Sequence, residues 1–458
     1  MKPLGHDAAL GDVDAVALAI QAAGLDPRAS RDKALLVRRA AEALEAAGTE
    51  RNLAAFFVPG RVEVLGKHTD YAGGRSMVIA AEQGFAVVVR PRDDRQIIVR
   101  AVDLGESADF VFDGDLIPRA GHWSNYPMTV ARRLARNFPG GLRGAKIALA
   151  ADLPPAAGMS SSSAMVVAMF LALDAVNHLA ARPEYRANIS TTVDLAGYLG
   201  TVENGRTFGS LVGDRGVGTF GGSEDHTAIL CGTAGCVNQY SYCPVRFERA
   251  VPLPSTHRLA IAASGVVAEK TGNALARYNA ASRRAAVAAE LWRGATGRDD
   301  PHLAAIANSS PEAVEQLRKI VLISSHEQFN AESLLTRFDQ FITESEQIIP
   351  RAGDALAGGD LEAFGTEVDR SQQAAERLLG NQVPETIHLA ACARRLGAAA
   401  ASAFGAGFGG SVWALVEASR MDAFLADWQV AYHRQFPQHA AAARFFSTTA
   451  GPAAFRIR

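Results

Sequence analysis

Residues 58–74 read VPGRVEVLGKHTDYAGG and change character halfway along. The first half has the Val-rich pattern of a short β-strand. The second half is a polar loop in which Lys67, His68 and Asp70 lie within four positions, and Arg61 stands on the strand before it. Stability alone gives no reason to gather these charges in one turn, and loops beside rigid elements often carry functional residues. We therefore interpret this stretch as part of a site.

The composition is that of an ordinary globular protein with room for two domains. The chain has 458 residues, of which 48% are hydrophobic and 21% charged. Its net charge of −2 gives no electrostatic reason to expect nucleic acid or an anionic membrane as a partner. We recognise no signal peptide and no apolar run long enough to span a membrane, and four cysteines are too few for a disulfide framework. We therefore expect a cytoplasmic protein.

The order of periodic segments predicts a mixed α+β architecture. Residues 1–50 are Ala-rich with helical periodicity, and residues 56–120 contain several short strands rich in Val and Ile. The apolar run TAILCG, residues 227–232, is interpreted as a strand. The chain then becomes mostly helical, and an Ala-rich helix is predicted over 389–403.

Two glycine-rich stretches imitate nucleotide-binding motifs without meeting their requirements. Residues 60–69 approach the phosphate-binding pattern G-x4-G-K-[ST], but five residues separate the glycines and His68 stands where Ser or Thr is needed. GAGFGG, residues 405–410, satisfies G-x-G-x-x-G, yet we expect a helix before it and a strand after it, which is the reverse of a dinucleotide-binding unit. We therefore reject both interpretations.

PPAAGMSSSSAMVV, residues 154–167, is the strongest candidate for phosphate binding. A loop of small residues leads into an apolar helix, whose first N–H groups have no partner inside the helix and whose dipole attracts anions. The four serines at 160–163 could cap the helix, contact phosphate or ligate Mg²⁺. A plain helix cap would account for only one of them.

Three stretches together resemble a known family. PGRVEVLGKHTDYAGG (59–74), LPPAAGMSSSSA (153–164) and GAGFGGSVWALV (405–416) are similar, in order and approximate spacing, to the three signature motifs of GHMP kinases. The resemblance is strongest to the galactokinase branch and covers roughly residues 56–458.

This resemblance implies a fold, an activity and cofactors. The fold is α+β and has two domains, one ribosomal-S5-like and one ferredoxin-like, with the active site in the cleft between them. The chain divides into a helical extension over 1–50, an N-terminal ATP-binding domain over 51–255 and a C-terminal domain over 256–458. The implied activity is phosphorylation of a monosaccharide at its anomeric hydroxyl, with ATP and Mg²⁺ as cofactors and the sugar and ATP as small-molecule partners.

Carried over to this chain, the first motif implies a sugar-binding loop. His68 and Asp70 match the family's sugar-binding His and Asp, and Arg61 matches an Arg beside the reacting hydroxyl. Two positions depart from the family. Lys67 stands where a Glu is expected, and Glu63 stands in place of an Asn.

The remaining motifs imply the catalytic base and the nucleotide site. GGSEDH, residues 221–226, resembles the segment that bears the catalytic carboxylate, which assigns that role to Asp225. Ser162 aligns with the hydroxyl that binds Mg²⁺, and Glu203 resembles its second ligand. The other sugar-contacting residues so implied are Lys67, Gly222 and Tyr278. The implied nucleotide-binding residues are Trp123, near the adenine, and Pro155, Ala156, Ala157, Gly158, Met159, Ser160, Ser161, Ser162 and Ser163.

The chemistry of phosphoryl transfer agrees with these assignments. Asp225 would accept the proton of a sugar hydroxyl, and Arg61 would favour its ionised form from ~4–6 Å and stabilise the developing alkoxide. Each residue also has a purely structural interpretation. Arg61 could pair with Glu63 on the surface, Asp70 could cap its loop and Asp225 could cap a helix beginning at Thr227. We favour the functional interpretation because the structural one requires several coincidences.

Lys67 leaves the substrate open. A cation cannot accept a hydrogen bond from a sugar hydroxyl, so Lys67 could meet a carboxylate or phosphate on the substrate, or pair internally with Glu63 or Glu82. A sugar acid, or a phosphorylated or longer sugar, then competes with galactose. Two other hypotheses remain: a catalytically silent sensor of ATP and sugar, suggested by the departures at Ala156 and Lys67, and a kinase for a non-sugar alcohol.

Overall fold

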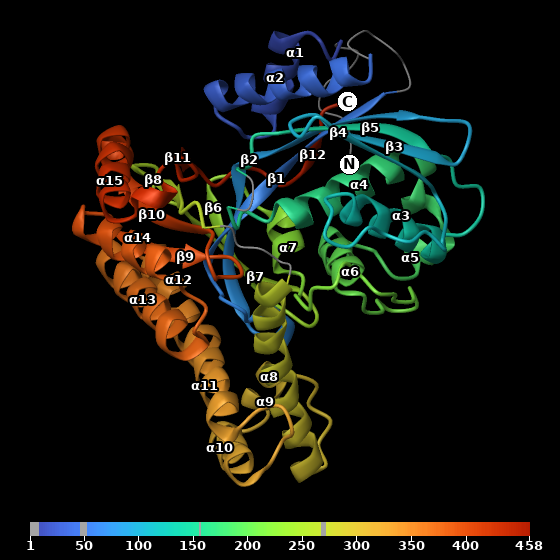
Figure 1. Ribbon diagram of the computed structural model, residues 1–458. Coiled ribbons are helices and arrows are strands. Elements are labelled where there is room, and N and C mark those ends of the chain that lie inside the picture. Colours follow the sequence, from blue (N-terminus) through green and yellow to red (C-terminus); the bar gives the residue numbers. More distant parts are fainter. Residues whose placement is uncertain (1–8, 46–52, 155–156, 267–271) are drawn as a thin grey trace.

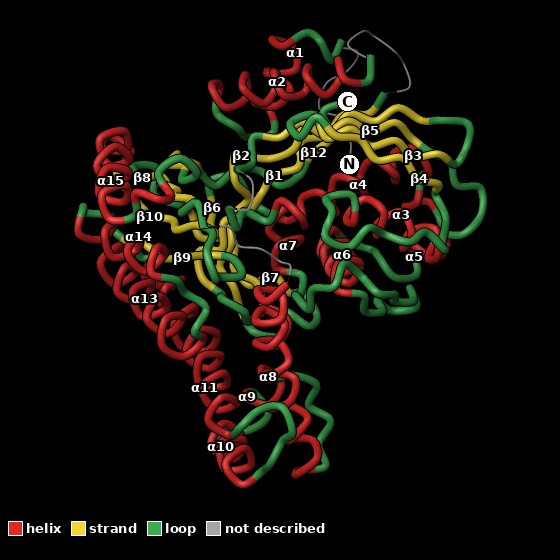
Figure 2. Tube along the Cα trace, viewed as in Figure 1, coloured by secondary structure: helices red, strands yellow, loops and turns green. Residues whose placement is uncertain are grey.

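The computed structural model describes residues 9–45, 53–154, 157–266 and 272–458. Two β-sheets organise this part of the chain, and helices cover them (Figures 1 and 2). The arrangement is α+β throughout, with strands and helices mixed along the chain.

The larger sheet has eight strands, in the order β12-β1-β2-β5-β3-β4, with β6 paired to β2 and β7 paired to β6. Its pairs are antiparallel except for β3 with β5. The strands are β1 (Ala54–Leu65), β2 (Arg75–Pro91), β3 (Gln96–Ala101), β4 (Glu106–Val111), β5 (Ala145–Ala151), β6 (Cys236–Ser241), β7 (Arg246–Pro252) and β12 (Phe455–Arg456). All 12 residues of β1 are buried, because helices cover the sheet on both faces around it.

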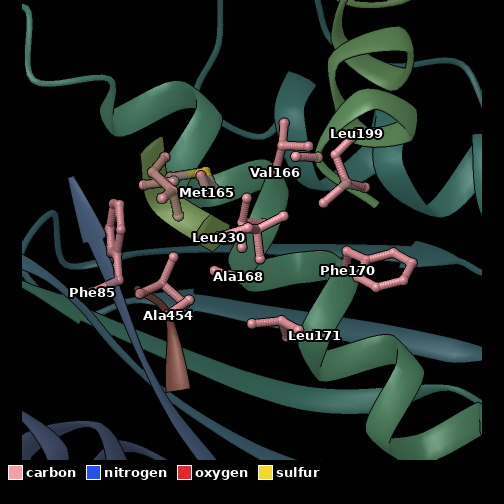
Figure 3. Packing of buried hydrophobic residues seen from close by; sticks show 14 of the residues in the cluster. Phe85, Met165, Val166, Ala168, Phe170, Leu171, Leu199, Leu230 and Ala454 are labelled. Carbon is pink, nitrogen blue, oxygen red and sulfur yellow. The ribbon is translucent and has the colours of Figure 1, made fainter. Parts of the chain in front are cut away.

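Two groups of helices lie on the opposite faces of this sheet. On one face are α1 (Val13–Ala22) and α2 (Pro27–Ala43), drawn in blue in Figure 1. On the other are α3 (Asn125–Asn137), α4 (Ser161–Asn177), α6 (Thr192–Asn204) and α7 (Glu224–Cys231), with the short α5 (Pro183–Arg186) beside them. Successive side chains of a strand alternate between faces, so Phe57 of β1 packs towards α2 while Phe56 and Val58 join the core around α4. Figure 3 shows that second core, in which Phe170 of α4 and Leu199 of α6 are labelled.

The smaller sheet has four antiparallel strands in the order β11-β8-β10-β9. They are β8 (His257–Ala263), β9 (Ala400–Phe404), β10 (Ser411–Glu417) and β11 (Arg444–Thr448). Its helices are α12 (Ile349–Ala357), α13 (Leu361–Ala374), α14 (Pro384–Arg395) and α15 (Met421–Gln435). Leu389 of α14 and Trp428 of α15 share one buried cluster with Val412 of β10.

A helical projection extends away from both sheets, at the bottom of Figure 1. It consists of α8 (Gly272–Thr296), α9 (Leu303–Ala307), α10 (Ala313–Ile323) and α11 (Ala331–Phe341). These helices have their own core, which includes Trp292, Leu317 and Phe338. A π-helical segment, Ile342–Ile348, connects α11 directly to α12 and brings this part of the chain back to the sheets.

Two predicted elements are wrong. Residues 227–232 lie largely in helix α7 and not in a strand, because a short apolar run is ambiguous and Glu224 and Asp225 in the first turn favour a helix N-terminus. The helix predicted over 389–403 is α14 followed by β9. Gly397, with φ of 94°, separates the two, and pairing with β10 outweighs the helical preference of the alanines.

The end of the chain contributes to both sheets. β11 belongs to the smaller sheet, whereas β12 returns to the larger one and places Arg456 opposite Phe56 of β1. Within the residues that the structure describes, we find no helix with the length and apolar character needed to cross a membrane.

Candidate functional site

A cavity of about 960 Å³ lies where the larger sheet faces the loops and strands of the smaller one. Its lining includes acidic side chains, namely Glu63, Asp70, Glu203, Glu224 and Asp225, and an apolar group, namely Phe85, Leu104, Trp123, Leu149 and Met165. The predicted site residues that line it are Arg61, His68, Asp70, Trp123, Gly158, Ser160, Ser161, Ser162, Ser163, Glu203, Gly222, Asp225 and Tyr278. Ala157 and Met159 are buried, and Pro155 and Ala156 lie outside the described residues.

Arg61 of β1 connects the proposed base to the phosphate-binding loop. Its Nε donates a hydrogen bond to Oδ1 of Asp225 at 2.7 Å, and its Nη1 donates to the carbonyl oxygen of Gly158 at 2.7 Å. Burial alone would lower the pKa of Arg61, but the negative charges of Asp225, Glu63 and Glu224 more than offset it, so its pKa is raised and it stays charged. The guanidinium therefore holds Asp225, in the first turn of α7, at a fixed place relative to the start of α4.

Ser163 lies between the two carboxylates that the sequence assigned to the metal and to the base. Its Oγ is 2.8 Å from Oε2 of Glu203 and 3.2 Å from Oδ2 of Asp225. A hydroxyl has one proton and donates to one of these oxygens at a time. Sequence reasoning singled out Ser162, which also lines the cavity, but it missed the link that Ser163 makes between α4, α6 and α7.

The loop after β1 presents His68 and Asp70 to the cavity. His68 has a left-handed φ of 60°, its Nδ1 is 2.9 Å from the hydroxyl of Tyr71, and its Nε2 is 3.1 Å from the carbonyl oxygen of Ala406. Asp70 accepts hydrogen bonds from the backbone N–H of Tyr71 at 2.8 Å and of Glu224 at 3.2 Å. These contacts tie the loop to α7 and to the glycine-rich loop before β10.

Gly222 and Tyr278 complete this part of the wall. A Cβ atom at Gly222 would lie 2.4 Å from Oδ2 of Asp70, so only glycine allows the close approach of these two segments. The ring of Tyr278, on α8, lies 5.1 Å from the ring of His68, measured between centroids. The helical projection therefore contributes a side chain to the cavity.

Lys67 differs from the predicted sugar-contacting position, because the structure places its side chain in the interior and not in the cavity lining that the described residues form. Its ammonium donates hydrogen bonds to Oγ of Ser371 at 3.0 Å and to Oγ of Ser402 at 2.9 Å, on α13 and β9. Ser371 in turn donates to Oε1 of Glu344 at 2.9 Å. Lys67 is 1% exposed, and the cavity lining given by the described residues does not include it. The side chain points into the protein because buried polar partners are available there.

Sequence reasoning also missed a set of polar side chains that fix the backbone of the loop. Arg337 of α11 donates to the carbonyl oxygen of His68 at 2.5 Å, and Gln340 donates to the carbonyl oxygen of Lys67 at 3.1 Å. Glu344, in the π-helical segment, accepts from the backbone N–H of Gly66 at 2.9 Å. These three residues, which we call the loop clamp, are buried on one side of a continuous helical stretch. Their one signal in the sequence is polar side chains at positions 337, 340 and 344, which lie on one face of a helix.

Three carboxyl groups in the acidic part of the cavity have raised pKa values. Burial raises the pKa of Glu63 to about 7, although Arg61 and Lys67 oppose the shift. Burial and the neighbouring charge of Glu63 raise the pKa of Glu224 well above its usual value, and burial also raises the pKa of Asp70. The carboxyl groups of Glu63, Glu224 and Asp225 share the guanidinium of Arg61 on this wall.

The two remaining glycine-containing loops lie against each other. Gly158 has φ of 70° and Ser160 has φ of 58°, so the chain turns sharply before α4 begins at Ser161. A Cβ atom at Gly405 would lie 3.1 Å from the carbonyl oxygen of Gly158. The glycine-rich stretch 405–410 therefore lies close, at Gly405, to the backbone of the candidate phosphate-binding loop.

Comparison with known proteins agrees with this site. The chain matches the galactokinase galactose-binding signature over residues 45–91, the GHMP kinase N-terminal domain over 125–205 and the GHMP kinase C-terminal domain over 354–433. It is 28% identical to the galactokinase of Roseiflexus sp. (strain RS-1) over 82% of this chain and 86% of that relative. It is 28% identical to the galactokinase of Exiguobacterium sibiricum over 88% of this chain and 93% of that relative.

Solved structures show the same fold. Lactococcus lactis galactokinase complexed with galactose superposes with a TM-score of 0.75 at 22% identity, covering 92% of this chain and 99% of that one. Methanococcus jannaschii mevalonate kinase superposes with a TM-score of 0.52 at 14% identity, covering 86% and 98%. The predicted fold class is confirmed, and the matches to the galactokinase signature, to both GHMP kinase domains and to galactokinases over most of the chain support a galactokinase-like sugar kinase.

Proposed function

We propose that this sugar kinase transfers the terminal phosphoryl group of ATP to the anomeric hydroxyl of a neutral monosaccharide, with Asp225 as the general base. The observation that carries the proposal is the position of Arg61, which bonds both Asp225 and the carbonyl oxygen of Gly158. One rigid group therefore sets the distance between the base and the loop at the head of α4, where the free N–H groups of a helix attract phosphate. GHMP kinases use ATP as the donor, and this loop is where its phosphates would lie.

The reaction follows from this placement. The sugar oxygen attacks the terminal phosphorus, its proton passes to a carboxylate oxygen of Asp225, and the bond to the β-phosphate oxygen breaks to release ADP. Arg61 stabilises the negative charge that develops on the sugar oxygen, because its own charge is fixed.

The oxygen atoms near the start of α4 fit a bound Mg²⁺. Glu203 offers a carboxylate, and the hydroxyls of Ser162 and Ser163 lie on the same helix turn. Among the described residues no group of three or more His, Cys, Asp or Glu side chains is arranged to hold a metal alone. Mg²⁺ is commonly held by one or two carboxylates together with substrate phosphates, so ATP would complete the ligand set. When bound, the ion neutralises charge on the phosphate oxygens.

The structure favours a neutral sugar over a sugar acid. The sugar-acid hypothesis relied on a cation at position 67, and that ammonium is buried against Ser371 and Ser402. Glu63 and Glu224 line the cavity instead, and burial there already raises the pKa of both groups, so a substrate carboxylate beside them would be disfavoured for the same reason. The relatives named galactokinase make D-galactose the first sugar to test.

An assay of ADP release tests the proposal. Wild-type protein is incubated with ATP, Mg²⁺ and, in turn, D-galactose, other neutral hexoses, hexosamines and uronic acids, and Asp225→Asn serves as the control. Turnover with a neutral hexose that the variant loses supports the proposal. Preferential turnover of a uronic acid, or undiminished turnover by Asp225→Asn, would contradict it.

A further inference from the structure

We propose that Glu63 is a sugar-binding residue, whose Oε1 accepts a hydrogen bond from a sugar hydroxyl other than the one that is phosphorylated. The inference rests on the proposed function and adds a specificity-determining contact to that site. The hydroxyl is a donor on a neutral sugar.

The first observation is an unsatisfied acceptor in the wall of the cavity. Glu63 lines the cavity and is 4% exposed, and its Oε1 has no hydrogen-bond partner among the described residues. Buried polar atoms are paired in the great majority of cases, and leaving one unpaired costs about 1–3 kcal/mol. Oε1 itself is buried, and the last side-chain torsion of Glu is broad, so a rotation of the carboxyl group would present this unpaired acceptor to a donor in the cavity.

The second observation is that neighbouring cations are already engaged. Arg61 uses its Nε and Nη1 on Asp225 and Gly158, and its Nη2 is 3.9 Å from Oε2 of Glu63, beyond hydrogen-bond distance. The Lys67 ammonium donates to two serine hydroxyls on the other side of the loop. The charges of both cations act on Glu63, but neither supplies the missing hydrogen bond to Oε1.

The third observation places Glu63 and the base within reach of one small molecule. Arg61 lies opposite Ala80 and Glu63 lies opposite Val78, so the strand is regular between them and both side chains leave the same face. Two residues along a strand correspond to about 6.6 Å, and Asp225 is bonded to Arg61. A hexose whose reacting hydroxyl is at Asp225 can direct another hydroxyl towards Glu63.

The charge around Glu63 selects the kind of group that it binds. Burial and the neighbouring carboxyl groups raise the pKa of Glu224, and burial raises the pKa of Asp70, which shows that this wall disfavours further negative charge, so an anionic substituent fits poorly there. A hydroxyl donor fits without adding charge. A protonated amino group would also be attracted to the carboxyl group of Glu63. If the protein prefers a hexosamine to the matching neutral hexose, the proposal as stated is therefore overturned.

The test compares Glu63→Met, which removes the acceptor at similar volume, with Glu63→Gln, which keeps one acceptor oxygen. Glu82→Gln is the matched control, because Glu82 is 7% exposed on β2 and accepts from the N–H of Thr449 at 3.1 Å, outside the cavity lining. Sugar affinity without ATP is measured by calorimetry, together with KM for sugar and for ATP and the melting temperature. The sugar is the one that wild type binds most tightly in a panel of D-galactose, D-glucose, D-mannose and D-galactosamine.

At pH 8, above the pKa of about 7 for Glu63, we expect Glu63→Met to weaken sugar binding and raise the sugar KM about 10- to 100-fold, the effect of losing one hydrogen bond to a charged group. Glu63→Gln should show a smaller loss, while the ATP KM changes less than twofold and Glu82→Gln resembles wild type. Unchanged sugar affinity in Glu63→Met, or an equal rise in both KM values, overturns the inference. The proposed function has its own test. If wild type binds these sugars but releases no ADP, the proposed function is wrong, while the comparison of sugar affinities still tests the role of Glu63.

Discussion

Replacing Lys67 with Met tests whether this residue stabilises the protein or binds substrate. The ammonium makes two hydrogen bonds in the interior, to Ser371 and Ser402, and Ser371 links it to the buried carboxylate of Glu344. Met keeps most of the apolar side-chain volume but removes the charge and both bonds. The Lys67→Met variant therefore isolates the polar contribution of this position.

The size of the effect follows from these contacts. Hydrogen bonds to charged groups contribute about 1.5–3 kcal/mol each, and removing one member of a buried ionic network usually costs about 3–5 kcal/mol. Dehydration of the ammonium, which the variant avoids, offsets part of this, so we expect a loss of about 3 kcal/mol. At about 2.1 cal/mol/K of unfolding entropy per residue, a chain of 458 residues changes its melting temperature by about 1 °C per kcal/mol. The expected decrease is therefore about 3 °C.

Calorimetry and steady-state kinetics together decide between the two roles. We expect Lys67→Met to melt about 3 °C lower and its sugar KM to stay within about threefold of wild type. Ser402→Ala should lower the melting temperature less, and the double variant should show less than the sum of the two losses, because both changes remove the same bond. A sugar KM raised tenfold or more with an unchanged melting temperature would refute the reasoning, since it would mean that Lys67 reaches the substrate.

Three further predictions concern the cavity. Asp225→Asn should lower kcat by about 10²–10⁴ with little change in the ATP KM, measured by ADP release, and a variant that retains a tenth of the rate would argue against a base at this position. Burial raises the pKa of Glu63 to about 7 from an ordinary 4.5, so the folded state keeps a proton that the unfolded state has lost between these values. The stability that this group contributes is therefore complete below about pH 4.5 and is lost as the pH rises through 7. Denaturant titrations at pH 5 and pH 8 measure this: the free energy of unfolding of wild type should fall by up to about 3 kcal/mol relative to that of Glu63→Gln. An equal change in both proteins would contradict the raised pKa. Arg337→Met should raise the sugar KM several-fold and leave the ATP KM unchanged, because its contacts to His68 and Tyr71 support the proposed sugar-binding loop, and equal effects on both constants would count against a local role.

Local patterns were sufficient to predict much of the fold and of the site. The helix that begins at Ser161 and the strand that carries Arg61 are encoded in continuous stretches with clear periodicity, so they could be placed without partners. The motif order also indicated that His68 and Asp225 share one site, although they are far apart in the chain, and both line the same cavity. Their individual roles stay predictions until they are measured.

The errors share a physical cause, which is dependence on distant partners. The segment from Ala400 is a strand because β10 pairs with it, and no local feature of an alanine run reveals that pairing. The direction of Lys67 depends on Ser371 and Ser402, which lie more than 300 residues later in the chain. Sequence reasoning identified the unusual residue correctly but could not tell which side of the loop its charge would occupy.

The position of that charge has a consequence for recognition. Because the ammonium of Lys67 lies in the interior, it supports the loop on the side away from the cavity, where it bonds Ser371. The loop clamp of Arg337, Gln340 and Glu344 bonds the backbone of the same loop, so the loop is positioned by the second half of the chain. The cavity side of the same loop is left with carboxyl groups, so a substrate is recognised there by the hydrogen atoms that it donates. A cation that supports the loop from the interior, and the acceptor that we propose at Glu63, would together explain how a galactokinase-like site can carry Lys at this position and still bind an uncharged sugar.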